Sequence, residues 1–181
     1  MKGPLPPLID SHCHLTEPIY SGKEEEYLDR AYQAGVKGVV SVGIDIETSR
    51  KAIEQAERFP DVYATIGLHP HNASTIDVKA LDELGELVSH EKVVAVGETG
   101  LDYHYDLSPR DLQRKAFAAQ VILARKAHRP LVVHSREAVG DCLEVIAGYG
   151  GGEVKGVFHC FSGTESEAFD ILKLGFYLSF A

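Results

Sequence analysis

The sequence predicts an α/β protein, a TIM-type (β/α)8 barrel that is incomplete because about seven strands are present. Short apolar runs rich in β-branched and aromatic residues alternate with amphipathic stretches along the chain. This alternation is typical of parallel strands joined by right-handed helical crossovers. A histidine or a carboxylate closes nearly every apolar run, which would gather these groups on one face of a barrel. An open doubly wound sheet is the alternative, but no G-x-G-x-x-G follows the first run.

The spacing of apolar residues predicts each element in turn. Apolar runs of strand character occur at 8–9, 36–42, 62–68, 93–96, 131–133, 154–158 and 176–180. Helical patterns occupy 24–34, 47–59, 78–89, 109–127, 136–147 and 164–174. We expect Ser108 to cap the helix that Pro109 begins. Gly35 and Gly175 are expected to follow helices in the left-handed conformation.

Composition indicates one globular domain, residues 1–181. Of the 181 residues, 44% are hydrophobic and 25% are charged, which is enough for a single core. No apolar run is long enough to cross a bilayer, and Met1 to Pro7 lacks the apolar stretch of a secretory signal. We therefore expect a cytoplasmic protein with no membrane partner. The net charge of −9 argues against broad nucleic-acid binding, but it permits a phosphate substrate because bound cations can reverse the local potential.

Cysteine usage argues against a disulfide framework or a C-x-x-C zinc site. The three cysteines, Cys13, Cys142 and Cys160, lie far apart in the chain. Strand alternation would turn Cys13 and Cys160 away from the adjacent histidines, so we expect both to be packing residues.

Four histidines and one glutamate at the strand ends form a candidate metal site. His12 and His14 are two residues apart on a strand, so their rings point the same way. Glu98, His134 and His159 close three later runs. Buried polar groups are costly unless they are satisfied, so this coincidence favours metal ligation over packing. The ligands exceed what one ion needs, which favours two divalent ions with Glu98 as the bridging, catalytic carboxylate.

Three more polar residues lie at the same predicted face without a required ligand role. We expect His69, His71 and Arg136 to bind substrate. The Arg136 guanidinium suits a phosphate oxygen, although a salt bridge to a nearby acid is an equal alternative. Two-metal chemistry would support hydrolysis of a phosphate ester or an amide.

Five motifs carry a family resemblance over the whole chain. They are Leu8-Ile-Asp-Ser-His-Cys-His14, Gly67-Leu-His-Pro-His71, Gly97-Glu-Thr-Gly-Leu-Asp-Tyr103, Val133-His-Ser-Arg136 and Phe158-His-Cys-Phe161. In this order they resemble the TatD family of metal-dependent hydrolases. The resemblance implies a TIM barrel with deoxyribonuclease or related phosphodiesterase activity, often as a magnesium-dependent 3′-5′ exonuclease, and hence a nucleic-acid substrate.

The resemblance also implies roles for the ligands. His12 and His14 match the pair for the first metal, Glu98 matches the bridge, and His134 and His159 match the pair for the second. Imidazole suits zinc or manganese whereas magnesium prefers oxygen, so Mg, Mn and Zn are all candidates. D-aminoacyl-tRNA deacylation or another amidohydrolase activity is the alternative. No lysine ends a predicted strand, which favours the phosphodiesterase.

One departure concerns a further aspartate ligand that the family carries at the end of its eighth strand. The sequence stops before that position, so it resembles a truncated member. A non-catalytic metal-binding fragment is therefore another alternative. Asp10 and Asp102 are not expected to replace the aspartate. Unpaired first and last strands would also allow self-association through the barrel edges.

Overall fold

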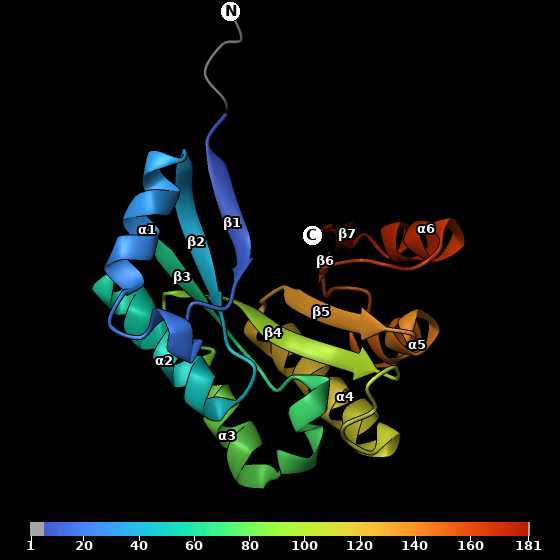
Figure 1. Cartoon of the computed structure of the whole chain (residues 1–181). Coiled ribbons are helices and arrows are strands. Elements are labelled where there is room, and N and C mark those ends of the chain that lie inside the picture. Colours follow the sequence, from blue (N-terminus) through green and yellow to red (C-terminus); the bar gives the residue numbers. More distant parts are fainter. Residues whose placement is uncertain (1–5, 181) are drawn as a thin grey trace, which may run out of the picture.

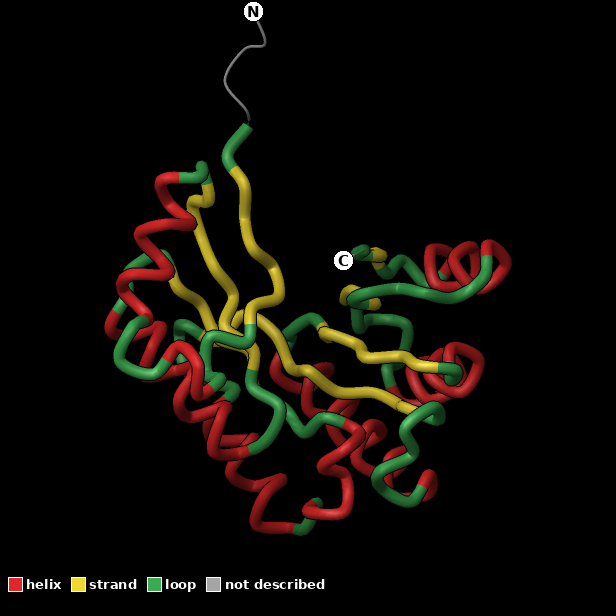
Figure 2. The backbone as a smooth tube through the Cα atoms, viewed as in Figure 1, coloured by secondary structure: helices red, strands yellow, loops and turns green. Residues whose placement is uncertain are grey.

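Seven parallel strands form one curled sheet with helices packed along its outer side (Figure 1). The computed structural model describes residues 6–180, so most of the N-terminal segment considered above lies outside the described residues. Neighbouring strands follow chain order from β1 to β7, as in a (β/α)8 barrel. Figure 2 shows the strands on the inside of the curve and the helices outside it. The predicted fold class is confirmed.

Every predicted run and helical pattern corresponds to an element, with shifted boundaries. The strands are β1 Leu8–Cys13, β2 Val36–Val42, β3 Val62–Ile66, β4 Val93–Asp102, β5 Leu131–Arg136, β6 Gly156–Phe158 and β7 Tyr177–Leu178. The helices are α1 Glu24–Gln33, α2 Ile46–Arg58, α3 Val78–Leu87, α4 Arg110–Ala127, α5 Val139–Tyr149 and α6 Glu165–Lys173, with 3₁₀ turns η1 Pro18–Tyr20 and η2 Pro70–Thr75. Among residues 6–180 we find no helix long and apolar enough to cross a membrane.

Boundary shifts at β4 and β5 change which polar residues belong to strands. Both strands continue beyond their apolar runs, and Asp102 pairs with Arg136 at the end of the shared ladder. Arg136 therefore lies in a strand, and the helix expected from residue 136 begins at Val139 instead. Polar residues at these strand ends hide the extension from an apolar pattern, although their backbones still pair.

Helix ends follow sequence signals in most places. In α2, Asp45 accepts from the Thr48 amide and Thr48 bonds back to the Asp45 amide, which completes a capping box. Gly35 and Gly175 adopt positive φ after α1 and α6, as expected. The prediction for Ser108 was wrong, because α4 begins at Arg110 and Ser108 instead donates its hydroxyl to the His71 carbonyl.

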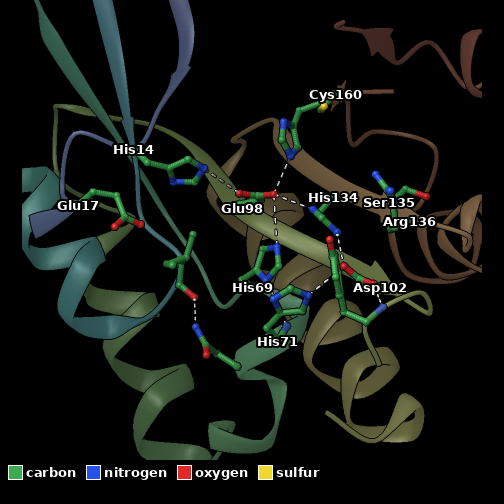
Figure 3. Close-up of a pocket in the computed structure, with 14 residues that line it drawn as sticks. His14, Glu17, His69, His71, Glu98, Asp102, His134, Ser135, Arg136 and Cys160 are labelled. Carbon is green, nitrogen blue, oxygen red and sulfur yellow. Dashed lines mark hydrogen bonds and ion pairs between the residues drawn. The ribbon is translucent and has the colours of Figure 1, made fainter. Parts of the chain in front are cut away.

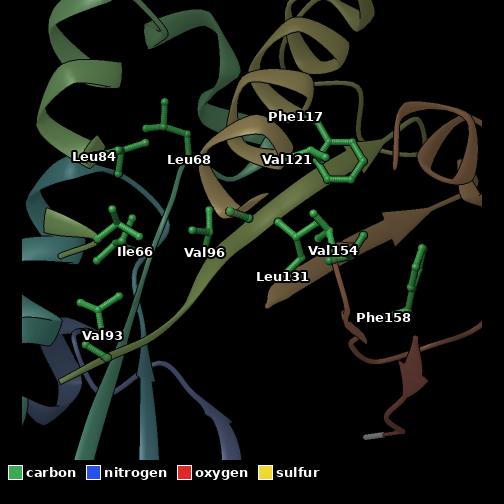
Figure 4. Close-up of a cluster of buried hydrophobic side chains, with 14 of the residues drawn as sticks. Ile66, Leu68, Leu84, Val93, Val96, Phe117, Val121, Leu131, Val154 and Phe158 are labelled. Atoms are coloured by element: carbon green, nitrogen blue, oxygen red, sulfur yellow. The ribbon is translucent and has the colours of Figure 1, made fainter. Parts of the chain in front are cut away.

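The core lies between the sheet and the surrounding helices (Figure 4). Ile66 of β3, Leu84 of α3, Phe117 of α4 and Leu131 of β5 are at most 1% exposed. Burial of apolar side chains on this side stabilises the helices against the strands. It also leaves the carboxyl ends of the strands free to carry polar groups.

Two buried glutamines of α4 hold the carboxyl ends of two strands. Gln120 accepts from the Leu68 amide at 2.7 Å and donates to the Leu68 carbonyl at 3.1 Å, just beyond β3. Gln113 accepts from the Asp102 amide at 2.8 Å and donates to the Asp102 carbonyl at 3.2 Å, at the end of β4. Both glutamines are fully buried. One helix therefore fixes the backbone beside His69 and beside Asp102.

The edges of the described sheet are β1 and β7. Leu8 and Ile9 on β1 are 45% and 61% exposed, and Tyr177 on β7 is 74% exposed. In the strands of a closed barrel such side chains would be covered, so these two edges are the least protected parts of the sheet.

Candidate metal centre

The curled sheet brings together the polar residues that close separate strands (Figure 3). His12 comes from β1, Glu98 from β4 and His134 from β5, while His159 directly follows β6. In Figure 3, Glu98 lies at the centre with His14 on one side. The four predicted histidine ligands thus converge on the Glu98 carboxylate.

The two oxygens of Glu98 face different histidines. Oε2 lies 3.3 Å from His12 Nε2 and 3.7 Å from His14 Nε2. Oε1 lies 2.9 Å from His134 Nδ1 and 2.7 Å from His159 Nε2. By these distances Oε2 faces the histidines of the first expected pair and Oε1 faces those of the second. The ligand atoms that converge most closely divide differently, because they combine His159 with His12.

His69 adds a third imidazole on the Oε1 side. Its Nε2 lies 3.5 Å from Glu98 Oε1, and the side chain is buried at the start of the turn after β3. The sequence analysis placed His69 among the substrate-binding residues because nothing in its position required it to be a metal ligand. In the structure it belongs to the same cluster of metal-ligating groups as Glu98 and His134.

Ligand atoms of three residues approach one another closely at two places. One group is His12, Glu98 and His159, and the other is His69, Glu98 and His134; within each group the ligand atoms lie within 4.8 Å of one another. Glu98 is common to both. A carboxylate shared by two groups of imidazoles is the arrangement that a bridged pair of divalent ions requires.

The electrostatics around Glu98 fit cations. Glu98 is 3% exposed, and burial raises the pKa of its carboxyl, but hydrogen bonds from the surrounding imidazoles outweigh burial and hold that pKa below its usual range. Burial lowers the pKa of His14 and His69, which favours the neutral imidazole that ligates metals. His12 Nε2 and His14 Nε2 lie only 3.2 Å apart. Two such lone pairs converging beside a carboxylate suit a divalent ion, so the residues present fit the metal.

Glycine permits the close approach of β4 and β5 beside the cluster. Gly100 has φ +144°, and a Cβ at this position would lie 2.0 Å from the His134 carbonyl oxygen. A side chain at this position would push apart the two strands that carry Glu98 and His134. This steric limit explains why the motif Gly97–Tyr103 has a glycine at position 100.

Asp102 is a functional residue whose role the sequence did not reveal. Its carboxylate is 1% exposed, and Oδ2 accepts from His71 Nε2 at 2.9 Å and from His134 Nε2 at 3.0 Å. A proton on His134 Nε2 leaves Nδ1, which faces Glu98, available as a ligand atom. Asp102 belongs to neither group of candidate metal ligands among the described residues. Strand alternation places Asp102 on the same face of β4 as Glu98, which was a weak signal of a role. Alternation predicts the face on which a side chain lies, but it does not predict the hydrogen-bond partner.

A cavity of about 440 Å³ opens above Glu98. Its lining includes His71 and Arg136, two of the residues expected to bind substrate, and the exposed Arg136 side chain makes no salt bridge within the described residues.

Cys160 also lines this cavity, is exposed and has φ +47°, so the packing role expected for it was wrong. β6 ends at Phe158, and strand alternation therefore does not extend to Cys160. Cys13 is half-buried against the core, as expected.

Asp10 lies apart from the cluster. Its Oδ1 accepts from the His12 amide at 3.2 Å, and the residue is exposed near the start of the site. It supports the backbone of the strand that carries His12 and His14. Asp10 belongs to neither group of convergent ligand atoms among residues 6–180.

A parallel barrel sheet with histidines and a shared carboxylate at its carboxyl ends defines a metal-dependent hydrolase. The sequence model for the TatD related DNase family matches residues 9–181. This chain belongs to that family.

Two bacterial relatives illustrate the similarity. The uncharacterized metal-dependent hydrolase YabD of Bacillus subtilis is 40% identical over 96% of this chain and 68% of its own length. The 3′-5′ ssDNA/RNA exonuclease TatD of Edwardsiella piscicida is 34% identical over 94% of this chain and 66% of its own. This chain thus spans about two thirds of the length of these relatives.

Solved structures give the same result. The crystal structure of YjjV, a TatD homolog from Escherichia coli K12, superimposes with a TM-score of 0.87 at 32% identity and covers 94% of this chain and 66% of that one. A TatD family hydrolase from Entamoeba histolytica also gives 0.87, at 30% identity, over 96% of this chain and 64% of that one.

Proposed function

We propose that this chain hydrolyses phosphodiester bonds of DNA as a 3′-5′ exonuclease, with two divalent ions held on opposite oxygens of Glu98. The observation that carries the proposal is that each Glu98 oxygen faces its own set of imidazole nitrogens. Paired ions about 3.5–4 Å apart bind the attacking and leaving oxygens and lower the pKa of a bound water. The named exonuclease activity of the Edwardsiella relative supports this choice.

We infer that residues 1–181 form a single domain, and that this domain provides both the metal ligands and the substrate-binding residues. Glu98 would bridge the ions, His12 and His14 would hold the first, and His134 and His159 would hold the second. His69 would add an imidazole beside His134, with which it shares a group of convergent ligand atoms. Arg136 and His71 line the cavity, where the guanidinium and the imidazole can bind non-bridging oxygens of the substrate phosphate.

The donor set limits the choice of metal to ions that accept imidazole. Five nitrogens and one carboxylate favour Mn²⁺ or Zn²⁺ by ligand type, and Mg²⁺ stays a candidate from the family resemblance. Activity with each ion, after removal of bound metal by a chelator, measures this preference.

The proposed activity is tested on a 5′-labelled single-stranded DNA with Mg²⁺, Mn²⁺, Zn²⁺ or EDTA. The 181-residue chain and the exposed control Glu86→Ala are expected to shorten the DNA from its 3′ end in a metal-dependent way. Glu98→Ala is expected to lose at least about 100-fold in rate, since residues that merely orient metal ligands are worth about 10–100-fold. Circular dichroism checks that the fold of each variant is retained.

Two other results would contradict the proposal in different ways. Undiminished metal-dependent digestion by Glu98→Ala would remove the bridging role. Inactivity of all three proteins, with metal still bound, would favour the alternative of a non-catalytic metal-binding fragment. D-aminoacyl-tRNA deacylation stays the alternative activity, and release of the amino acid from a D-aminoacylated tRNA measures it.

Self-association through the sheet edges is a separate proposal. The exposed apolar side chains of Leu8, Ile9 and Tyr177 on β1 and β7 support it. Sedimentation of the chain beside an Ile9→Lys variant tests it, because a charge on an edge strand discourages edge-to-edge pairing.

A further inference from the structure

An exposed aromatic side chain lies beside the metal cluster without a role in the mechanism above. Tyr105 follows β4, is 60% exposed and lines the same cavity as Glu98. Leu107, two residues later, is 66% exposed. An exposed apolar segment formed by these two residues thus begins in the lining of a polar cavity.

The backbone of Tyr105 is held firmly in place. Its amide donates to Asp102 Oδ1 at 2.8 Å, and the His104 amide donates to the same oxygen at 3.1 Å. Asp102 is itself buried and hydrogen-bonded to His134. The position of the Tyr105 backbone is therefore linked to the histidines around Glu98. A preorganised aromatic group loses little conformational entropy when it binds a ligand.

The Tyr105 ring has two aromatic neighbours, and neither is stacked parallel on it. The rings of His71 and His104 lie 5.7 Å and 4.8 Å away, each at 88° to the tyrosine. Both neighbours are perpendicular, and no parallel-stacked partner of Tyr105 occurs within residues 6–180. The Tyr105 hydroxyl makes no hydrogen bond to the described residues either. A structural hydrogen bond therefore does not account for a tyrosine at this position.

We propose that Tyr105 is a stacking surface for a nucleobase next to the scissile phosphodiester of a single-stranded nucleic acid. The proposal rests on the proposed function. Among the described residues Arg136 is the one lysine or arginine that lines the cavity, and the chain carries a net charge of −9. Away from the two proposed ions the cavity therefore offers little positive charge to the nucleic-acid backbone, and stacking supplies affinity that does not depend on charge. Every base has a π-face, so such a surface binds single strands with little sequence preference.

The absence of tryptophan from the sequence allows a direct measurement. Tyr105→Trp introduces a single fluorophore at the rim, and Tyr149→Trp introduces one at an exposed tyrosine at the far end of α5. The probe is a phosphorothioate oligothymidylate, compared with the same oligomer carrying abasic sites. We expect the normal oligomer to quench Tyr105→Trp, the abasic oligomer to quench it much less, and neither to quench Tyr149→Trp.

Kinetics give a second readout. On normal single-stranded DNA, Tyr105→Ala is expected to raise KM about tenfold with a smaller change in kcat, within the range measured for loss of base stacking. Tyr105→Phe is expected to retain the wild-type KM. On DNA that is abasic on both sides of the cleaved bond, wild type and Tyr105→Ala should have the same KM.

Failure of this inference is distinguishable from failure of the proposed function. Equal quenching by normal and abasic oligomers, or an unchanged KM in Tyr105→Ala while the wild type digests DNA, would overturn stacking and leave the nuclease proposal standing. A wild type that neither digests nor binds the oligomers would overturn both.

Discussion

At the scale of single residues, Asp102 links the metal cluster to the rim of the cavity. One of its oxygens accepts from His134 and His71, and the other from the amides of His104 and Tyr105. Burial raises the pKa of the Asp102 carboxyl, but these hydrogen bonds lower that pKa by more. The pKa of Asp102 is therefore below its usual value. Asp102 is therefore ionised at neutral pH and can only accept hydrogen bonds, which sets the tautomer of His134.

We predict that Asp102→Asn weakens metal binding about 10–100-fold while the fold is retained. The amide can donate to His134 Nε2, which favours the tautomer with its proton on Nδ1, the atom that faces Glu98. Calorimetric titration with Mn²⁺ measures the affinity. Asp106→Asn is the matched control, because Asp106 is exposed and bonds only to the α4 segment. Equal affinities in both variants would show that Asp102 does not orient His134.

The cysteines provide a test based on pKa. Burial raises the pKa of the Cys142 thiol to about 12, so Cys142 is protonated at pH 8, and its side chain is also inaccessible. Cys160 is exposed at the cavity. Because the thiolate is the nucleophile, iodoacetamide should modify Cys160 in the native protein and leave Cys142 intact. Peptide mass spectrometry measures both sites, and modification of Cys142 at the rate of Cys160 would contradict the packing described here.

At the scale of elements, α4 positions the site through its buried glutamines. Gln113 and Gln120 lie on the face of α4 that meets the ends of β4 and β3. Their amide groups match backbone donors and acceptors that the ladders leave free at these ends, so the backbones of Leu68 and Asp102 stay hydrogen-bonded. The apolar pattern predicted the helix, but two polar residues on its buried face are not part of that pattern.

Gln120→Leu is predicted to lower the free energy of unfolding by about 1–3 kcal/mol, because the amide and carbonyl of Leu68 lose their partners in a buried environment. Urea denaturation measures this change. Gln33→Leu, at an exposed position of α1, makes the same substitution without such partners and should change stability by less than about 0.5 kcal/mol. A small effect at Gln120 would mean that water or neighbouring groups satisfy the Leu68 backbone.

At the scale of the whole molecule, the curl of the sheet makes one site from five separate strand ends. Residues from His12 to His159 meet because parallel strands in chain order point their carboxyl ends to the same side. This geometry made the cluster predictable, since the histidines and Glu98 close apolar runs that the sequence shows plainly. Strand alternation likewise placed His12 and His14 on one face.

Other features of the site depend on contacts that periodicity does not encode. The proximity of His69 to Glu98 arises from the turn after β3, where strand alternation has already ended. The position of Cys160 depends on a residue with positive φ beyond β6. Asp102 and Tyr105 are joined by a side chain-to-backbone hydrogen bond within a loop. Such local geometry depends on tertiary packing, so the sequence pattern predicts that a site exists and leaves its supporting contacts open.

The central claim is that Glu98 holds two divalent ions, one on each oxygen. Anomalous diffraction from crystals soaked in Mn²⁺ tests it most directly. The predicted result is two peaks about 3.5–4 Å apart, one near His12 and His14 and the other near His134 and His159, both lost or weakened in Glu98→Gln. A single peak, or two peaks that persist unchanged in Glu98→Gln, would contradict the bridging role.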